Sequence, residues 1–266
     1  MVNLDIGTLN DYGPVVDGEV IPRSPFELLR DQSYLRSVGA LDRSYVVGAN
    51  NAEAGTIEDV TTPEIVSQYI RSISQSVSPY PLNNDHLNVI DFLYTYPMDE
   101  QGKHSVQTII DMTTDTNFVV PSVLFARLIT EVSNQTDVFL YLLDHYQQVK
   151  DPSSPLRGSN HGHDVLFEFD LTPSLRADSM NDYIILGTPT NTPLYGIFGG
   201  AVASFAKTGT PVSQLQTPLR WPRFDPSQEK FMASHWSHLY AQQVALWLDF
   251  LPRMGSSWKS SRIAFP

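Results

Sequence analysis

The 266-residue sequence contains no cysteine. Disulfide bridges, zinc–thiolate centres and a cysteine nucleophile are therefore excluded, although the compartment stays open because proteins without disulfides are also secreted. Positive charge is scarce as well: 17 Lys and Arg stand against 29 Asp and Glu, which gives a formal net charge of −12. This balance disfavours nucleic acid as a partner, since phosphates need clustered basic side chains.

Long apolar runs are also missing. No stretch of about 18 apolar residues occurs, so no membrane span is expected. Residues 1–30 lack the basic and apolar regions of a signal peptide. Residues 1–23 are polar and turn-rich, and a domain seldom begins with so long a structureless arm. We therefore expect a chain that continues from something upstream, with residues 1–12 as a connecting arm and residues 252–266 as a tail.

The composition is that of a globular protein. Hydrophobic residues make up 41% and charged residues 17% of the chain, which is enough to bury a core. No internal repeat or low-complexity linker divides the sequence, so we expect residues 1–266 to belong to one domain.

Apolar runs at residues 44–49 and 138–143 predict buried strands, and a third short strand is expected near 230–234. Helix-start signals and apolar periodicity predict helices at 24–29, 62–77, 85–96, 104–114, 121–132, 195–207 and 239–253. This alternation indicates an α/β fold with a mainly parallel sheet. Three strands are too few to cover so many apolar helices, so further strands should come from another segment.

Several segments of the sequence become informative when they are considered together, in the order in which they occur along the chain. They are residues 13–18 (GPVVDG) with 24–29 (SPFELL), 45–55 (YVVGANNAEAG), 139–145 (FLYLLDH), 160–169 (NHGHDVLFEF), 203–211 (ASFAKTGTP) with 221–224 (WPRF), and 244–250 (VALWLDF). Together they resemble the second half of the type B carboxylesterases and cholinesterases, a family that includes the neuroligins. The resemblance implies the C-terminal half of an α/β-hydrolase fold, completed by an upstream segment or a companion chain.

The family's nucleophile motif is absent from this sequence. Its first half carries an oxyanion-hole glycine segment and a G-x-S-x-G elbow, and no G-x-S-x-G occurs here; residues 158–162 (GSNHG) have similar letters at the wrong spacing. Either the serine lies on another chain or it has been lost.

The resemblance implies that Glu53 is the acid and His161 the base of a Ser-Glu-His triad, in the chain order that α/β-hydrolases use. Without the resemblance, an exposed turn carboxylate would be the favoured interpretation of Glu53, and Glu58 and Asp59 are neighbouring but less well placed acids. Ala54, between Glu53 and the following glycine, is a small departure from the family pattern.

His163 competes with His161 for the role of the base. The family's H-G-x-E/D segment aligns with His161, and Asp164 would then support the loop by hydrogen bonding. Metal ligation by the two histidines is disfavoured, because the loop offers no third ligand beyond Asp164. The other histidines (His86, His104, His145, His235 and His238) are expected at the surface or core edge, and no cofactor is expected.

Two functions follow from the resemblance. The chain could supply the acid and base of a carboxylic-ester hydrolase whose serine lies outside it, with aromatic residues from 65–120 lining a pocket for an ester or small apolar ligand. Alternatively, it could be a non-catalytic cholinesterase-like domain with a neuroligin-like adhesion, structural or carrier role. The resemblance also implies an extracellular location, where the sequon beginning at Asn134 would be a glycosylation acceptor, and it leaves a homo-oligomer open.

Overall fold

The protein is described by a computed structural model, which defines residues 14–54, 62–78, 81–95, 104–144, 158–169, 192–212, 221–229, 231–233 and 241–254. The expected arm (1–12) lies outside these residues. So does most of the expected tail, of which residues 252–254 end the last helix. The termini of the predicted elements agree closely with the observed ones.

A three-stranded parallel sheet forms the centre of the fold. Its order is β1 (Tyr45–Asn50), β2 (Val138–Leu143) and β3 (Met232–Ala233). Tyr45 lies opposite Val138 at the start of the first pairing. Within the described residues β1 pairs with β2 alone. The predicted parallel α/β architecture is confirmed, and the narrow sheet agrees with the expectation that strands from another segment complete it.

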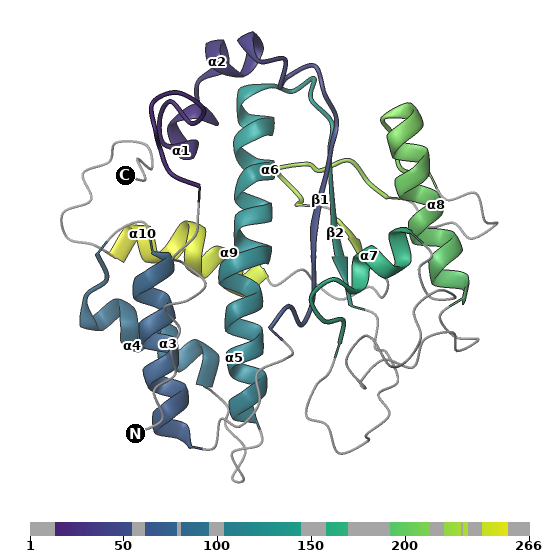
Figure 1. The fold of residues 1–266 in the computed structure, drawn as a ribbon. Helices are drawn as coiled ribbons and strands as arrows, with labels where there is room; N and C mark the ends of the chain where they lie inside the picture. The colour runs from purple at the N-terminus through teal and green to yellow at the C-terminus, as the bar shows by residue number, and fades with distance from the viewer. Residues whose placement is uncertain are drawn as a thin grey trace.

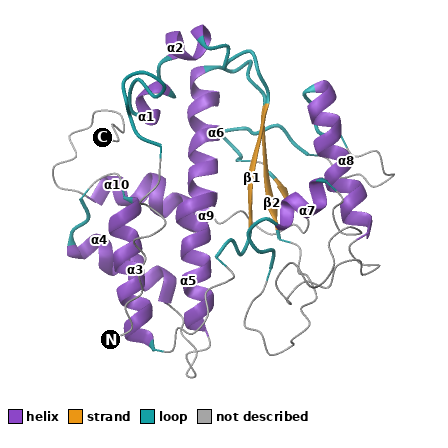
Figure 2. Cartoon of the chain, viewed as in Figure 1, coloured by secondary structure: helices purple, strands orange, loops and turns teal. Residues whose placement is uncertain are grey.

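Helices cover both faces of the sheet (Figures 1 and 2). On one face α6 (Val120–Val132) packs against β1 and β2, while α7 (His163–Glu168) and α8 (Thr192–Thr208) pair on the other. The side chains of β2 divide accordingly, because successive residues of a strand point to opposite faces. Leu140 belongs to the larger core cluster and Phe139 to the smaller one. Burial on both faces explains why β2 is a continuous apolar run.

Helix α5 (His104–Thr114) lies in line with α6, and α2 (Gln32–Ser37) lies at the far end of α6 (Figure 1). The remaining helices lie on the side of this column away from the sheet: α1 (Pro25–Leu28), α3 (Pro63–Val77), α4 (Asn84–Thr95), α9 (Ala241–Ala245) and α10 (Leu251–Met254). The Thr62 side chain caps α3 by accepting from the backbone N–H of Ile65, as its sequence position indicates. Helix α2 was not predicted; Asp31 caps it by accepting from Tyr34 N at 2.9 Å.

The helices predicted at 104–114 and 121–132 are joined rather than separate. A π-helical turn, η2 (Asp115–Val119), connects α5 to α6, and a second, η3 (Leu246–Phe250), connects α9 to α10. A proline follows each turn at the same offset, Pro121 and Pro252. Proline has no N–H and clashes with the carbonyl four residues back, and a π turn relieves that conflict without ending the helix.

Candidate functional site

Glu53 lies just beyond the carboxyl end of β1 and folds back onto it. Its side chain is 4% exposed, and Oε1 accepts from the backbone N–H of Asn50 at 2.7 Å and from the side-chain amide of Asn50 at 3.3 Å. The backbone N–H of Glu53 donates to Thr114 Oγ1 at 2.9 Å. These contacts hold Glu53 between the end of the sheet and the end of α5.

The loop that carries His161 is tied to the loop that carries Glu53. Ala52 and Asn160 form an isolated parallel bridge, and Ala52 N donates to Ser159 O at 3.0 Å. Asn51 Oδ1 accepts from Ser159 N at 2.7 Å. Gly158 has a φ of +100°, and a Cβ there would overlap the Asn51 side chain, so both its backbone conformation and its close approach to Asn51 call for glycine.

This arrangement brings Glu53 and His161 together. Glu53 Oε2 lies 2.7 Å from His161 Nδ1, and the imidazole side chain is 69% exposed. A carboxylate can only accept a hydrogen bond, so the pairing favours the tautomer with the proton on Nδ1 and a free lone pair on Nε2. The Phe118 ring lies 5.5 Å from the imidazole, centroid to centroid, and supports it from η2. The geometry suits proton transfer at Nε2.

Asp164 links this loop to both long strands of the sheet. Its Oδ1 accepts from Asn50 Nδ2 at 3.1 Å and from Val165 N at 3.0 Å, and its Oδ2 accepts from the Tyr141 hydroxyl at 2.8 Å. Burial, together with the nearby Asp164 charge, raises the pKa of Tyr141, so the phenol keeps the proton that it donates.

His163 bonds to a different group from His161. It is buried, and its Nδ1 accepts from Asn160 N at 2.9 Å, an interaction that fixes the turn into α7. His86 is also buried, rather than at the surface or core edge as expected, because its Nδ1 accepts from Asn83 N at the start of α4. Among the described residues, no group of three or more His, Asp or Glu side chains is placed to hold a metal ion.

Some candidate residues cannot be placed. Glu58, Asp59, His145, His235 and His238 lie outside the described residues, and the structure describes the backbone of His104 but not its side chain.

In the described parts of the chain, no helix is long and apolar enough to cross a bilayer.

Sequence reasoning missed Asn50, Thr114 and Tyr141 as parts of the site. A signal existed for Tyr141, which is the one polar-tipped side chain in the apolar run of β2. Its place beside Asp164 depends on the pairing of β1 with β2: Gly48 lies opposite Tyr141, and a Cβ on Gly48 would overlap the Tyr141 ring. That pairing could not be obtained from either strand alone.

Comparison with known proteins gives the family of the chain. Residues 4–247 match the model of the carboxylesterase family. Human neuroligin-2 is 23% identical to this chain over 269 residues, and mouse neuroligin-3 is 26% identical over 274 residues. Each match covers 96% of this chain and 30% of the relative, so the chain spans about 30% of the length of the curated relatives that it matches. The family match covers most of the chain, and the protein belongs to the carboxylesterase family.

Proposed function

We propose that this chain supplies the acid and the base of a Ser-Glu-His triad that hydrolyses carboxylic esters. The observation that carries the proposal is the 2.7 Å approach of Glu53 Oε2 to His161 Nδ1, with the acid buried and the base exposed. Burial keeps water away from the acid, which strengthens its interaction with the imidazolium that forms during the reaction. The serine belongs to a segment outside this chain, an upstream half or a companion chain.

In the proposed reaction, His161 Nε2 takes the proton of the serine hydroxyl as the oxygen attacks the ester carbonyl. The imidazolium then returns that proton to the departing alcohol, which leaves an acyl-enzyme. His161 next takes a proton from a water molecule as the water oxygen attacks the acyl carbon. The imidazolium returns that proton to the serine oxygen as the bond between this oxygen and the acyl carbon breaks, which releases the carboxylic acid and regenerates the serine. Glu53 acts by fixing the tautomer and orientation of the ring throughout.

The sheet suggests where the serine-bearing segment attaches. In the part of the chain that the structure describes, β1 uses only its edge toward β2 for pairing. A strand added at the other edge would continue the parallel sheet and would end on the same side as Glu53, because parallel strands share their carboxyl edge. A strand edge without a partner strand has unpaired backbone donors and acceptors, which also favours such pairing.

The second candidate is a non-catalytic cholinesterase-like domain with an adhesion role. The observation that favours it is the similarity to neuroligin-2 and neuroligin-3 along 96% of this chain. An extracellular location would suit both candidates. Asn134 is exposed in the turn between α6 and β2, as a glycosylation acceptor would need to be.

A fluorophosphonate probe on the whole protein, including its serine-bearing segment, separates the two candidates. The hydrolase predicts covalent labelling of one serine, slowed by about 10²-fold or more in His161→Gln and Glu53→Gln. Glu131→Gln, an exposed carboxylate at the end of α6, is the matched control and should label at the original rate. An intact fold that takes no label would overturn the hydrolase and favour the non-catalytic domain.

A further inference from the structure

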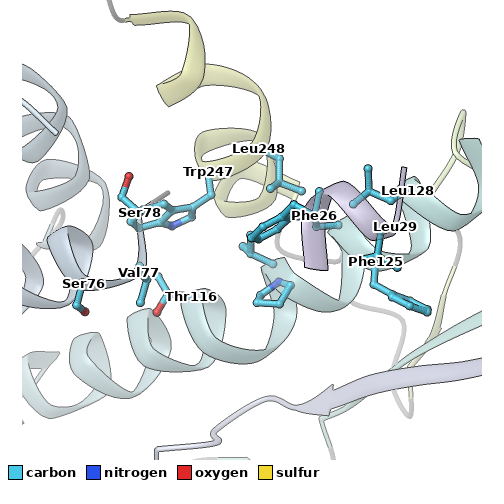
Figure 3. A pocket seen from close by; sticks show the side chains of 13 residues that line it. Phe26, Leu29, Ser76, Val77, Ser78, Thr116, Phe125, Leu128, Trp247 and Leu248 are labelled. Atoms are coloured by element: carbon cyan, nitrogen blue, oxygen red, sulfur yellow. The ribbon is translucent and has the colours of Figure 1, made fainter. Parts of the chain in front are cut away.

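A cavity of about 530 Å³ lies beside α6, among α1, the end of α3, η2 and η3 (Figure 3). Its size is within the range of small-molecule sites in proteins. Four segments that are far apart in the sequence enclose it, so it is concave rather than a flat face. Exposed residues at its rim, Ser76 and Pro121, leave it open to solvent, while Leu128, Trp247 and Leu248 are buried in its wall.

This cavity is separate from the Glu53–His161 pair. Thr114 and Phe118 contact that pair, whereas Thr116 and Val120 line the cavity. Residues two apart on a helix point to opposite sides. The α5–η2–α6 helix therefore stands between the cavity and the proposed catalytic residues.

The lining is apolar at one end and hydroxylic at the other. Leu29, Phe125 and Leu128 lie at the first end, and the hydroxyl-bearing residues Ser76, Ser78 and Thr116 gather at the second (Figure 3). Among the residues that the structure describes, no Asp, Glu, Lys, Arg or His lines the cavity. A charged ligand would lose its hydration there without a compensating partner, so the cavity suits a neutral molecule.

The hydroxyl groups define the polar end of that molecule. Ser76 Oγ donates to Ile73 O at 2.9 Å, and Thr116 Oγ1 donates to Met112 O at 2.8 Å. Each hydroxyl has one hydrogen, so both oxygens keep lone pairs that can only accept. The complementary group on a ligand is a donor, such as a hydroxyl.

The wall is rigid where an aromatic ligand would contact it. Trp247 Nε1 donates to the Tyr94 hydroxyl at 3.1 Å, and that hydroxyl donates to Asp115 Oδ2 at 2.8 Å. The indole of Trp247 is therefore held in place before any ligand arrives, which lowers the entropy lost on binding. Phe26 and Phe125 offer further aromatic surface.

We propose that this cavity binds a neutral, apolar alcohol, aromatic or long-chain, with its hydroxyl directed to Thr116 and Ser76 and its apolar body between Trp247 and Phe125. The site is independent of the triad and does not require the chain to be part of an enzyme.

Calorimetric titration of the whole protein with 1-naphthol tests the proposal, with 1-naphthoate and 1-methoxynaphthalene as matched probes. We expect one naphthol per chain. The charged naphthoate and the methyl ether, which cannot donate, should bind at least several-fold more weakly. No saturable binding of naphthol, as when another part of the protein fills the cavity, or equal binding of the three probes, would overturn the proposal.

Two variants test whether naphthol binds in this cavity. Thr116→Val should weaken naphthol binding by about 3- to 10-fold, since it removes one hydrogen-bond acceptor at constant shape. Thr130→Val is its control, because Thr130 makes the same helix-backbone bond, to Ala126 O, but does not line the cavity. Leu124→Trp should abolish binding by filling the space, with circular dichroism confirming the fold. Undiminished binding in Thr116→Val, at an unchanged stoichiometry, contradicts the assignment even if Leu124→Trp fails to fold.

Discussion

The Tyr141 hydroxyl donates to Asp164 Oδ2 across 2.8 Å, which joins the central strand β2 to the first turn of α7. Asp164 follows His161 by three residues, so the position of the exposed imidazole depends on a buried strand. The Asn50 side-chain amide, which contacts both Glu53 and Asp164, closes this network on the side of β1. These hydrogen bonds connect both loops to the sheet.

Tyr141→Phe should destabilise the protein by about 1–3 kcal/mol, because Asp164 Oδ2 loses the hydroxyl that donates to it, and only Oδ1 keeps its donors, Asn50 Nδ2 and Val165 N. Tyr69→Phe is the control: its hydroxyl bonds to the neutral Thr113 hydroxyl at 2.9 Å, and its loss should be about 1 kcal/mol or less. Urea unfolding of both variants gives the comparison. Equal losses would show that the Asp164 charge adds nothing to the Tyr141 bond.

Asn50→Asp should lower the stability of the protein only slightly at low pH and strongly at neutral pH. The new carboxyl would stand beside Glu53 and Asp164, and like charges raise pKa values, so stability should fall as pH rises and the group ionises. We expect a loss of about 3 kcal/mol at pH 7 and a smaller one at pH 4, where a shared proton can replace the amide donor.

The control for Asn50→Asp is Asn88→Asp on the exposed face of α4. There Asn88 Oδ1 accepts from Arg71 at 2.8 Å, and a carboxylate keeps that interaction. Urea midpoints at pH 4 and pH 7 should hardly change in the control. A pH-independent loss in Asn50→Asp would mean that shape, rather than charge, dominates at this position.

Local patterns in the sequence are enough to predict most of the elements. The apolar run 138–143 is typical of a strand covered on both faces, and Thr62 before Pro63 gives the start of α3. The π turns could not be predicted in the same way. A proline such as Pro121 usually marks a helix start, and only the packing of the α5–η2–α6 helix against the sheet and α3 shows that the helix continues through it.

The Glu53–His161 pair was predicted from the family resemblance, since neither residue has a distinctive local pattern. The network around the pair was not predicted, because it depends on long-range pairing. Ala52 meets Asn160 through an isolated bridge, and Gly48 admits the Tyr141 ring only in the observed strand register. Such contacts follow from how the chain closes in space and leave no periodic signal.

Two adjacent glycines in α8 should respond oppositely to alanine. A Cβ on Gly199 would lie 2.7 Å from the backbone oxygen of Phe167, whereas nothing lies within 4 Å of a Cβ on Gly200. Gly199→Ala should therefore push α8 away from α7 and cost about 1–3 kcal/mol. Gly200→Ala should stabilise the helix by about 0.5–1 kcal/mol. Thermal unfolding measures both, and a stabilised Gly199→Ala would show that α7 and α8 do not pack this closely.

Asp115 should make the protein less stable as pH rises. It is fully buried at the start of η2, and Tyr94 donates to its Oδ2, while within the described residues no group bonds its Oδ1. Burial raises the pKa of Asp115 from 3.8 to about 8, against the opposing effect of the Tyr94 bond and with a further rise from Asp111. In the unfolded chain the same carboxyl ionises near pH 4, so between pH 4 and pH 8 only the unfolded state loses the proton.

Asp115→Asn removes this titration while keeping an acceptor for Tyr94. The variant should gain stability relative to the natural protein as pH rises from 4 to 8. Because the pKa of Asp115 is raised from 3.8 to about 8, the gain should be up to about 5 kcal/mol. Asp31→Asn is the control: Arg23 lowers the pKa of the partly exposed Asp31 carboxyl, so any stability that this carboxylate contributes is lost only as pH falls below 4. Urea unfolding across pH 4–8 should thus give a rising difference for Asp115→Asn and a flat one for Asp31→Asn. Parallel curves for Asp115→Asn and the natural protein would mean that Asp115 ionises normally and is reached by water.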